Sequence, residues 1–253
     1  MAKKLYLSAA SHASDNPTAC PDACSENTHC NLYMDLLESR MKALGVQVRR
    51  GAKTATGTTA LTKRVREANA WGADLYYVAH TNAGGGRYSM TMCWGDAVSR
   101  AKANVLHKYR KSLPEHKVVA RQDLYEIRAT AMLCLYDELF FHDNAEDCAW
   151  FHSGGMEQMV EETVQALCQI LGATYKKPVK KENTVPVHKA GEKVTLNKGR
   201  LYVASTGTAS VRRTGTFYLY DGKAINGRFR VTNRKSRVGK KPVTLHVSGW
   251  VKL

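Results

Sequence analysis

The chain has 253 residues, of which 43% are hydrophobic, and its formal net charge is +16. This length suits one large domain or two smaller ones, and the apolar content supports a packed core, which argues against a disordered chain. No apolar run reaches about 18 residues, so we expect no membrane-spanning helix. The apolar run from Leu5 to Leu7, behind Lys3 and Lys4, is too short for the core of a signal peptide. We therefore expect synthesis in the cytoplasm, and another route of release for any action outside the cell.

The charge is unevenly distributed along the chain. Residues 1–175 contain 19 basic and 19 acidic residues, whereas residues 176–253 contain the other 19 basic residues and only 3 acidic ones. This asymmetry predicts two functionally distinct parts. The basic part favours a polyanionic partner, such as nucleic acid, anionic lipid or an anionic polymer of the teichoic acid kind.

Apolar residues in the neutral part follow strand and helix periodicities in turn. The expected strands lie at 4–9, 46–48, 74–79, 88–94, 117–120 and 132–136. The expected helices lie at about 27–44, from a cap at Thr58 or Thr59 to Gly72, from Asp96 to Pro114, and from a cap at Asn144 to Gly172. Strands that alternate with helices predict an α/β fold, with a mostly parallel sheet flanked by helices on both faces.

The strand at 74–79 leads into the most informative stretch of the chain. It is short, apolar and rich in β-forming residues, so we expect it to be buried and to stop at His80, ahead of Gly84, Gly85 and Gly86. A histidine and a flexible glycine loop at the end of a buried strand are typical of binding sites in α/β folds. A solvated strand end with an incidental histidine stays open as an alternative, because a lone histidine is weak evidence.

The periodicity changes to two in the basic part. Residues 176–186 are polar, basic and proline-bearing, which is typical of a linker. The expected division is therefore 1–175, a linker at 176–187, and 188–253. Short strands are expected at 194–196, 201–203, 217–220, 229–231 and 243–247. Many short strands separated by turn residues predict a small all-β barrel.

Seven cysteines are scattered along the chain, and their odd number argues against a disulfide framework. Cys20, Cys24 and Cys30 are close enough for a metal knuckle. No second Cys/His pair follows at zinc-finger spacing, which argues against a structural zinc there. Cys134 and Cys168 lie in apolar runs and are expected to be small core residues.

Three candidate metal ligands, His12, Glu26 and His80, stand in loops that follow strands. Two neutral imidazoles and one carboxylate form a catalytic zinc set with the fourth position open for water. Glu26 could instead only meet a helix dipole, and His29 is a rival ligand, although it would lie on the helix itself. Glu138 ends an apolar strand, where burial raises the pKa of a carboxyl group and suits it to general acid–base work. Solvated faces or helix ends are expected for His107, His142 and His152.

Several segments of the neutral part together carry a family resemblance. They are Ser11-His12, Glu26 at the start of a helix, Leu61-x-x-Arg64-x-x-x-Ala68-Asn69-x-x-x-Ala73-Asp74-Leu75, His80-Thr81-Asn82-Ala83, and Leu135-x-x-Glu138-Leu139-x-Phe141-x-x-Asn144-x-Glu146-Asp147. Through them the chain from Lys4 to about Gly172 resembles the zinc-dependent N-acetylmuramoyl-L-alanine amidases of the type-3 family, particularly those used as phage endolysins.

The resemblance implies roles for four residues. His12, Glu26 and His80 would be the ligands of one Zn²⁺ per chain, and Glu138 would be the catalytic glutamate. The reaction implied is hydrolysis of the amide between the lactyl group of N-acetylmuramic acid and the first L-alanine of the stem peptide. The family often has glycine on both sides of the first histidine, whereas Ser11 and Ala13 flank His12 here.

The C-terminal part carries a looser resemblance, through Gly191-x-x-Val194-x-Leu196, Leu201-Tyr202, Gly215-Thr216-Phe217-Tyr218, Asn226-Gly227-Arg228-Phe229-Arg230-Val231-Thr232 and Gly249-Trp250-Val251. It resembles the bacterial SH3-like cell-wall-binding domains of endolysins. The candidate substrate-binding residues are Asn82 in the first part and Tyr202, Tyr218 and Trp250 in the second. Tyr220 could likewise offer a flat face to sugar or peptide, and about half of these four barrel aromatics are expected to be core residues instead.

Two functions of different classes are compatible with these features. The first is a two-module endolysin that binds bacterial peptidoglycan and anionic wall polymers, and acts on the cell wall after release from the cytoplasm. The second is a nucleic-acid-binding protein that uses its basic C-terminal domain. The absence of a helix-turn-helix, zinc-finger or RNA-recognition signature and the neutrality of residues 1–175 favour the first.

Overall fold

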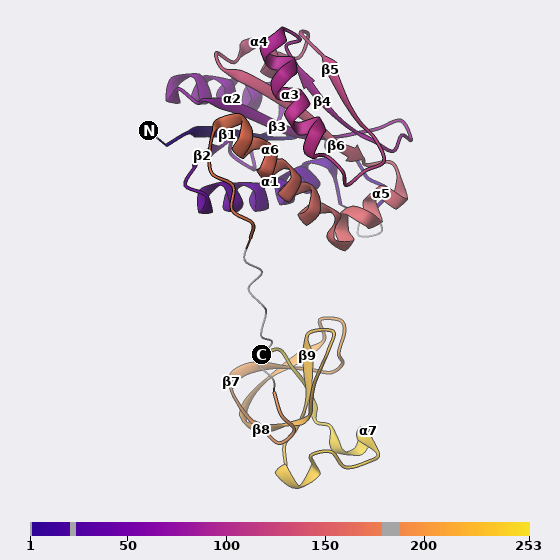
Figure 1. The fold of residues 1–253 in the computed structure, drawn as a ribbon. Coiled ribbons are helices and arrows are strands. Elements are labelled where there is room, and N and C mark those ends of the chain that lie inside the picture. Colours follow the sequence, from indigo (N-terminus) through magenta and orange to yellow (C-terminus); the bar gives the residue numbers. More distant parts are fainter. Residues whose placement is uncertain (1, 21–23, 179–187) are drawn as a thin grey trace. The chain divides into compact units, whose positions relative to one another are not determined.

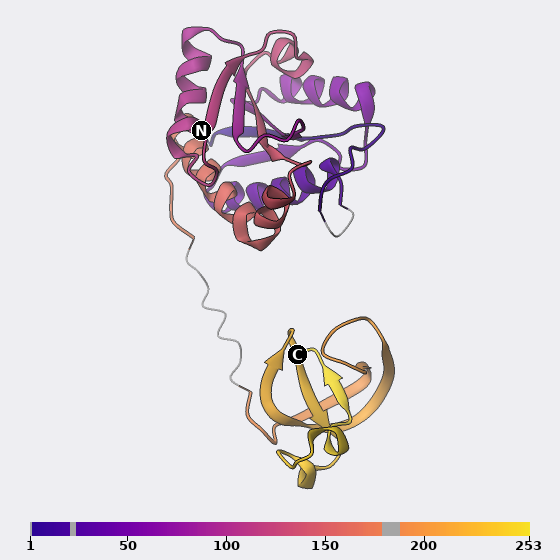
Figure 2. The ribbon, with the colours of Figure 1, turned by 90° about the vertical axis from the view of Figure 1, so that its right-hand side faces the viewer.

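A computed structural model describes residues 2–20, 24–178 and 188–253 (Figures 1 and 2). The chain divides into two compact units, Met1–Lys177 and Pro178–Leu253. Positions 179–187 of the expected linker lie outside the described residues. Within the described ranges, every helix is too short or too polar to cross a bilayer.

The first unit is built on a six-stranded sheet. Its strands are β1 (Lys4–Ala9), β2 (Gln47–Arg50), β3 (Leu75–Asn82), β4 (Ser89–Cys93), β5 (His116–Ala120) and β6 (Leu133–Phe141). They lie in the order β2-β1-β3-β6-β4-β5, and β4 is antiparallel to β6 while the other neighbouring pairs are parallel. The loop between β3 and β4 is too short for a crossover, so it reverses the chain direction. The predicted mostly parallel sheet is confirmed.

Helices cover both faces of this sheet (Figures 1 and 2). One face carries α1 (Glu26–Ala43), α3 (Ala97–Tyr109) and α6 (Met156–Leu171), and the other carries α2 (Gly57–Trp71) and α4 (Tyr125–Ala129). Successive side chains of a strand point to opposite faces, so a sheet covered on both sides has fully apolar strands. In β3, Leu75 and Tyr77 join the core under α1 and α6, whereas Tyr76 and Val78 join the core under α2.

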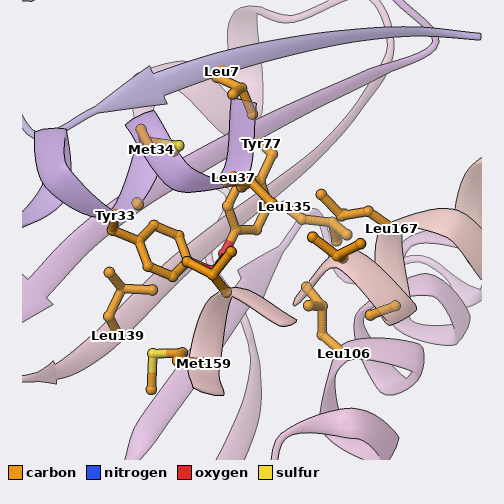
Figure 3. Close-up of a cluster of buried hydrophobic side chains, with 14 of the residues drawn as sticks. Leu7, Tyr33, Met34, Leu37, Tyr77, Leu106, Leu135, Leu139, Met159 and Leu167 are labelled. Carbon is orange, nitrogen blue, oxygen red and sulfur yellow. Dashed lines mark hydrogen bonds between the residues drawn. The ribbon is translucent and has the colours of Figure 1, made fainter. Parts of the chain in front are cut away.

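The larger core, part of which Figure 3 shows, also contains a group of polar side chains that pair with one another. The Tyr33 hydroxyl lies 2.6 Å from Thr163 Oγ1 and 3.1 Å from the Tyr77 hydroxyl. The Tyr77 hydroxyl in turn donates to Asp137 Oδ2 at 2.7 Å. Asp137 also pairs with Arg110, and both side chains are almost fully buried. Buried charge is tolerated here because each group has partners.

Two strands run further than their apolar patterns predict. β3 continues through His80 to Asn82 rather than stopping at His80, and its pairing with β6 shifts between these two residues. β6 extends to Phe141, so Glu138 lies within the strand rather than at its end. Both extensions include polar residues that find partners elsewhere in the fold, which the local pattern does not reveal. The short helix α4 was not predicted at all.

Two of the expected helices differ in detail. Thr56, rather than Thr58 or Thr59, is the N-cap of α2, and it makes no side-chain capping bond. The predicted long helix from Asn144 is interrupted: Asn144 caps α5 (Ala145–Trp150), and the irregular turn η1 (Phe151–Gly155) separates α5 from α6. Gly154 has a φ of 111° inside this turn, a conformation that L-residues rarely adopt and that breaks the helix.

The second unit is a closed antiparallel barrel. Its strands β7 (Lys193–Tyr202), β8 (Ser210–Ile225), β9 (Arg228–Thr232) and β10 (Gly249–Val251) are arranged in the order β10-β7-β8-β9. The barrel is filled by apolar side chains, among them the fully buried Leu219 and Val231. The predicted small barrel is confirmed, although the strands expected at 194–196 and 201–203 are one bent strand, β7.

The prediction of a barrel strand at residues 243–247 is wrong. Residues 243–247 alternate apolar and polar side chains, but they form the short helix α7 (Val243–His246), which follows the one-turn helix η2 (Lys235–Arg237) and Pro242. None of the α7 residues is buried, and Leu245 is 70% exposed. The alternation therefore does not reflect a buried strand face, which is the condition that makes this pattern informative.

Candidate active site

Three of the predicted ligands come together at one edge of the first sheet. His12 follows β1, Glu26 is the first residue of α1, and His80 lies in β3. One ligand atom from each lies within 4.8 Å of the others. Glu26 Oε2 is 3.1 Å from His12 Nε2, and Glu26 Oε1 is 3.0 Å from His80 Nδ1.

The sheet topology brings these residues together. β1 and β3 are adjacent and parallel, with Ala9 opposite Ala79, so their carboxyl ends meet at the same edge. The loop after β1 is tied to the start of α1 by the Asn27 side chain, which accepts from the His12 amide and donates to the His12 carbonyl, both at 3.0 Å. This pair of bonds fixes the backbone of His12 beside the residue that follows Glu26.

Glu26 is buried and its carboxylate is fully engaged. Oε1 accepts from the Thr81 amide at 3.0 Å, and Oε2 accepts from Asn16 Nδ2 at 2.6 Å. Burial alone would raise the pKa of Glu26, but His80, Asn16 and the Thr81 amide outweigh it and lower that pKa to about 2. Glu26 is therefore ionised. Its carboxylate lies at the N-terminus of α1, and it also contacts the two histidines, so its role is not limited to the helix dipole.

Glu138 lies beside His80 on the neighbouring strand. The two residues are opposite each other in the β3–β6 register, so their side chains leave the sheet on the same face. Its Oε2 atom is buried and has no hydrogen-bond partner among the described residues. Burial raises the pKa of Glu138 to about 7; His80 opposes this shift, and the charge of Glu26 adds to it. Asp137, one residue earlier, points to the opposite face and joins the core.

The carboxyl groups of Glu26 and Glu138 lie near His80, and their negative charge favours a cation at this position. Burial disfavours a charged imidazole, but Glu26 and Glu138 raise the pKa of His80 above its ordinary value. The ring also stacks on Tyr136, with 4.8 Å between the ring centroids. The site thus combines an electronegative set of ligand atoms with a ring held in a fixed orientation.

His142 belongs to this neighbourhood, although it was expected on a solvated face. It follows β6 directly, is only 6% exposed, and places Nδ1 2.9 Å from Thr81 Oγ1 and 4.0 Å from Glu26 Oε2. The sequence could have indicated this placement, because His142 comes just after a strand that is parallel to β3 and therefore ends at the edge where His80 lies. His107 and His152 are exposed, as predicted.

The four predicted substrate-binding residues are divided between the two units. Asn82 ends β3, and its Oδ1 accepts from the Ala83 amide at 2.8 Å. In the barrel, Tyr202 and Trp250 are paired across β7 and β10, and both line a groove of about 360 Å³. Tyr218 is half-buried on β8 and is not among the residues that line this groove. Tyr220 is buried, so it is one of the barrel aromatics that belong to the core.

Comparison with known proteins identifies the family. Residues 9–169, more than half of the chain, match the N-acetylmuramoyl-L-alanine amidase family Amidase_3. The chain belongs to this family. A curated amidase, CwlM of Bacillus licheniformis, is 31% identical over 118 residues, which is 43% of this chain and 45% of CwlM. The match thus spans less than half the length of that relative.

Solved amidase structures share the fold of the first unit. The catalytic domain of CwlV from Bacillus (Paenibacillus) polymyxa var. colistinus superposes with a TM-score of 0.61 at 20% identity, covering 68% of this chain and 99% of that domain. An amidase from Clostridium difficile 630 gives 0.60 at 18% identity, covering 68% and 97%. The catalytic domain of the CD27L endolysin gives 0.54 at 16% identity, covering 66% and 97%.

The three ligand-type residues at the sheet edge are of the kinds that bind a catalytic zinc ion. The family is generally zinc-dependent, and His12, Glu26 and His80 supply the two imidazoles and one carboxylate of an open catalytic zinc set. His12 Nε2 is buried and makes no hydrogen bond of acceptable geometry in the described part of the chain, although Glu26 Oε2 lies 3.1 Å away, so a metal would give both atoms a partner. A buried polar atom without a partner is costly, which favours a ligand there.

Proposed function

We propose that this amidase family member cleaves the amide between N-acetylmuramic acid and L-alanine in peptidoglycan, with one zinc ion held by His12, Glu26 and His80. The observation that carries the proposal is the convergence of these three side chains, from three separate elements, beside the largely buried Glu138. A zinc ion bound there would supply Lewis acidity toward the scissile carbonyl and toward water.

The chain's own residues would transfer the proton and hold the metal ligands in position. Glu138 would take a proton from water and give it to the alanine nitrogen, because an amide nitrogen is a poor leaving group until it is protonated. Its position opposite His80 would keep the carboxylate next to the ligands and free to exchange a proton with water. The Thr81 amide and Asn16 would hold Glu26 in place, which fixes the third ligand before substrate binds.

We further propose that the barrel is an SH3-like wall-binding domain. Its groove with Tyr202 and Trp250 offers flat faces for sugar or peptide, and Arg228 and Arg230 lie over these rings at 3.7 Å and 5.1 Å. Tyr218 is not among the residues that line this groove. The positive charge of residues 176–253 suits anionic wall polymers. A phage or prophage endolysin that is released from the cytoplasm would combine these two activities.

Digestion of purified peptidoglycan tests the proposal. The full chain should release stem peptides with a new free N-terminal alanine, detected by mass analysis, and a chelator should abolish the release. Glu138→Gln should release almost none while keeping its metal. Products cut at any other bond would refute the assignment. Tight binding to DNA but not to cell wall, falling steeply with salt, would instead support a nucleic-acid function for the basic part.

A further inference from the structure

A second group of ligand-type side chains lies on the first unit, outside the active site. It consists of Cys20 and Cys24 in the loop before α1, His29 in the first turns of α1, and His152 in η1. One ligand atom from each of the four lies within 4.8 Å of all the others. His29 and Cys20 are buried, Cys24 is half-buried, and His152 is exposed.

The distances place these atoms around a common centre. His29 Nε2 lies 3.3 Å from Cys20 Sγ, 3.2 Å from Cys24 Sγ and 3.0 Å from His152 Nε2. His152 Nε2 is in turn 3.4 Å from Cys24 Sγ. A ring nitrogen carries either one lone pair or one N–H, so it satisfies only one partner at a time. Three polar neighbours around one nitrogen are therefore not explained by hydrogen bonding.

The donor set selects the kind of metal. Two sulfur and two imidazole ligands, with three residues between the cysteines, match the Cys2His2 type of structural zinc site, in which all four positions are filled by protein. Phe140 and Phe151 pack against the His29 ring at 5.4 Å and 5.3 Å between centroids, so the inner side of the group is apolar. Cys148 neighbours Cys20, and its Sγ donates to the His142 carbonyl at 3.3 Å.

We propose that Cys20, Cys24, His29 and His152 bind a second, structural zinc ion that fastens the loop before α1 to η1. The loop joins β1 to α1, with His12 near its start and Glu26 as the first residue of the helix that follows it, and η1 is an irregular break between helices. A metal that joins the two would add a direct tie between them beside the apolar contacts of Phe151. The inference concerns metal content and stability, and it stands whether or not the proposed activity is correct.

The zinc content of the purified full chain tests this site. We expect about two zinc ions per chain by atomic emission. His152→Ala and Cys24→Ser change residues that are not fully buried, so the fold should survive, and each should lower the content to about one. The matched control Cys134→Ala removes a buried cysteine on β6, outside the group, and should keep two. His80→Ala should also leave one ion, and combined with His152→Ala it should leave none.

Cobalt substitution separates the two sites by their ligands. Co²⁺ in a site with two thiolates gives intense thiolate-to-cobalt charge-transfer absorption in the near ultraviolet, whereas a His–Glu–His site gives none. We expect this band in the wild-type chain and in His80→Ala, and its loss in Cys24→Ser. Wild-type protein with one zinc ion that His152→Ala does not disturb would overturn the proposal. A Cys20–Cys24 disulfide in protein purified under reducing conditions with zinc present would also overturn it.

Discussion

The buried ion pair between Arg110 and Asp137 offers a direct test of what stabilises the first unit. Arg110 Nη2 pairs with Asp137 Oδ2, and the two side chains are 1% and 0% exposed. Asp137 also accepts from the Tyr77 hydroxyl at 2.7 Å and from the Thr91 hydroxyl at 2.6 Å. Asp137→Asn keeps the volume of the side chain but removes its charge and one of its two acceptor oxygens.

The expected loss of unfolding free energy is about 3–5 kcal/mol, the range for a buried pair that has lost one partner. The reason is that the Arg110 guanidinium would remain buried with only the Met159 carbonyl at 3.1 Å and Glu162 at 3.9 Å. The exposed pair of Arg121 and Asp123 provides a matched control, because Asp123→Asn makes the same change where solvent screens the charge. That variant should unfold close to the wild-type midpoint.

Urea denaturation followed by tryptophan fluorescence measures this difference. In a Trp250→Phe background the remaining tryptophans, Trp71, Trp94 and Trp150, all report on the first unit. If Asp137→Asn moves the midpoint no further than the Asp123→Asn control does, the reasoning about the buried pair is wrong.

The same pair predicts how stability depends on pH. Burial alone would raise the pKa of Asp137, but Arg110, His116 and Thr91 outweigh it and hold that pKa well below its ordinary value. A group with a lowered folded-state pKa stabilises the protein above its unfolded pKa of about 4, and this contribution is lost as the pH falls. The gap in stability between wild type and Asp137→Asn should therefore narrow below about pH 4.

The proposed function gives three further predictions. Glu138→Gln should keep its zinc and its fold but lose about 10²–10⁴-fold in peptidoglycan cleavage rate, because the general base is gone; loss of zinc would mean that Glu138 is a ligand. His80→Ala should lose the active-site ion and all cleavage, measured by atomic emission and product analysis, and full retention of zinc would contradict the ligand assignment. The fragment 1–175 should cleave solubilised wall fragments but act weakly on intact wall, because tethering by the barrel raises the local enzyme concentration. The fragment 188–253 should bind wall, in part through salt-sensitive charge, and cleave nothing. An insoluble or inactive 1–175 fragment beside an active full chain would refute the division of labour.

The order of strands and helices was accessible from the sequence because it depends on local apolar periodicity. The ends of elements were less accessible, because polar residues inside β3 and β6 are stabilised by distant partners. His80 and Asp137 are examples: their partners Glu26 and Arg110 lie on α1 and directly after α3. No local pattern reports such pairs, so the predicted strands stopped too early.

The ligand set at the sheet edge was accessible for a different reason. His12 and His80 both follow the apolar part of strands that become parallel neighbours, so topology alone predicts their proximity. The Cys/His group was not accessible in this way. His29 and His152 are 123 residues apart in sequence, and the turn that presents His152 exists because Gly154 breaks the expected helix. A search for zinc-finger spacing misses a ligand supplied across the fold.

The first turn of α1 links the two ligand groups. Glu26 and His29 are three residues apart on this helix, which places them on neighbouring positions of one face. Glu26 meets His12 and His80, whereas His29 meets Cys20, Cys24 and His152. A metal bound by the second group would fix the rotation and axial position of α1, and with them the Glu26 carboxylate. Catalytic groups must be held to within a fraction of an ångström, and a polar loop supplies little apolar packing to do so. A closed metal site at this turn would therefore give the open one the rigid support that the loop lacks.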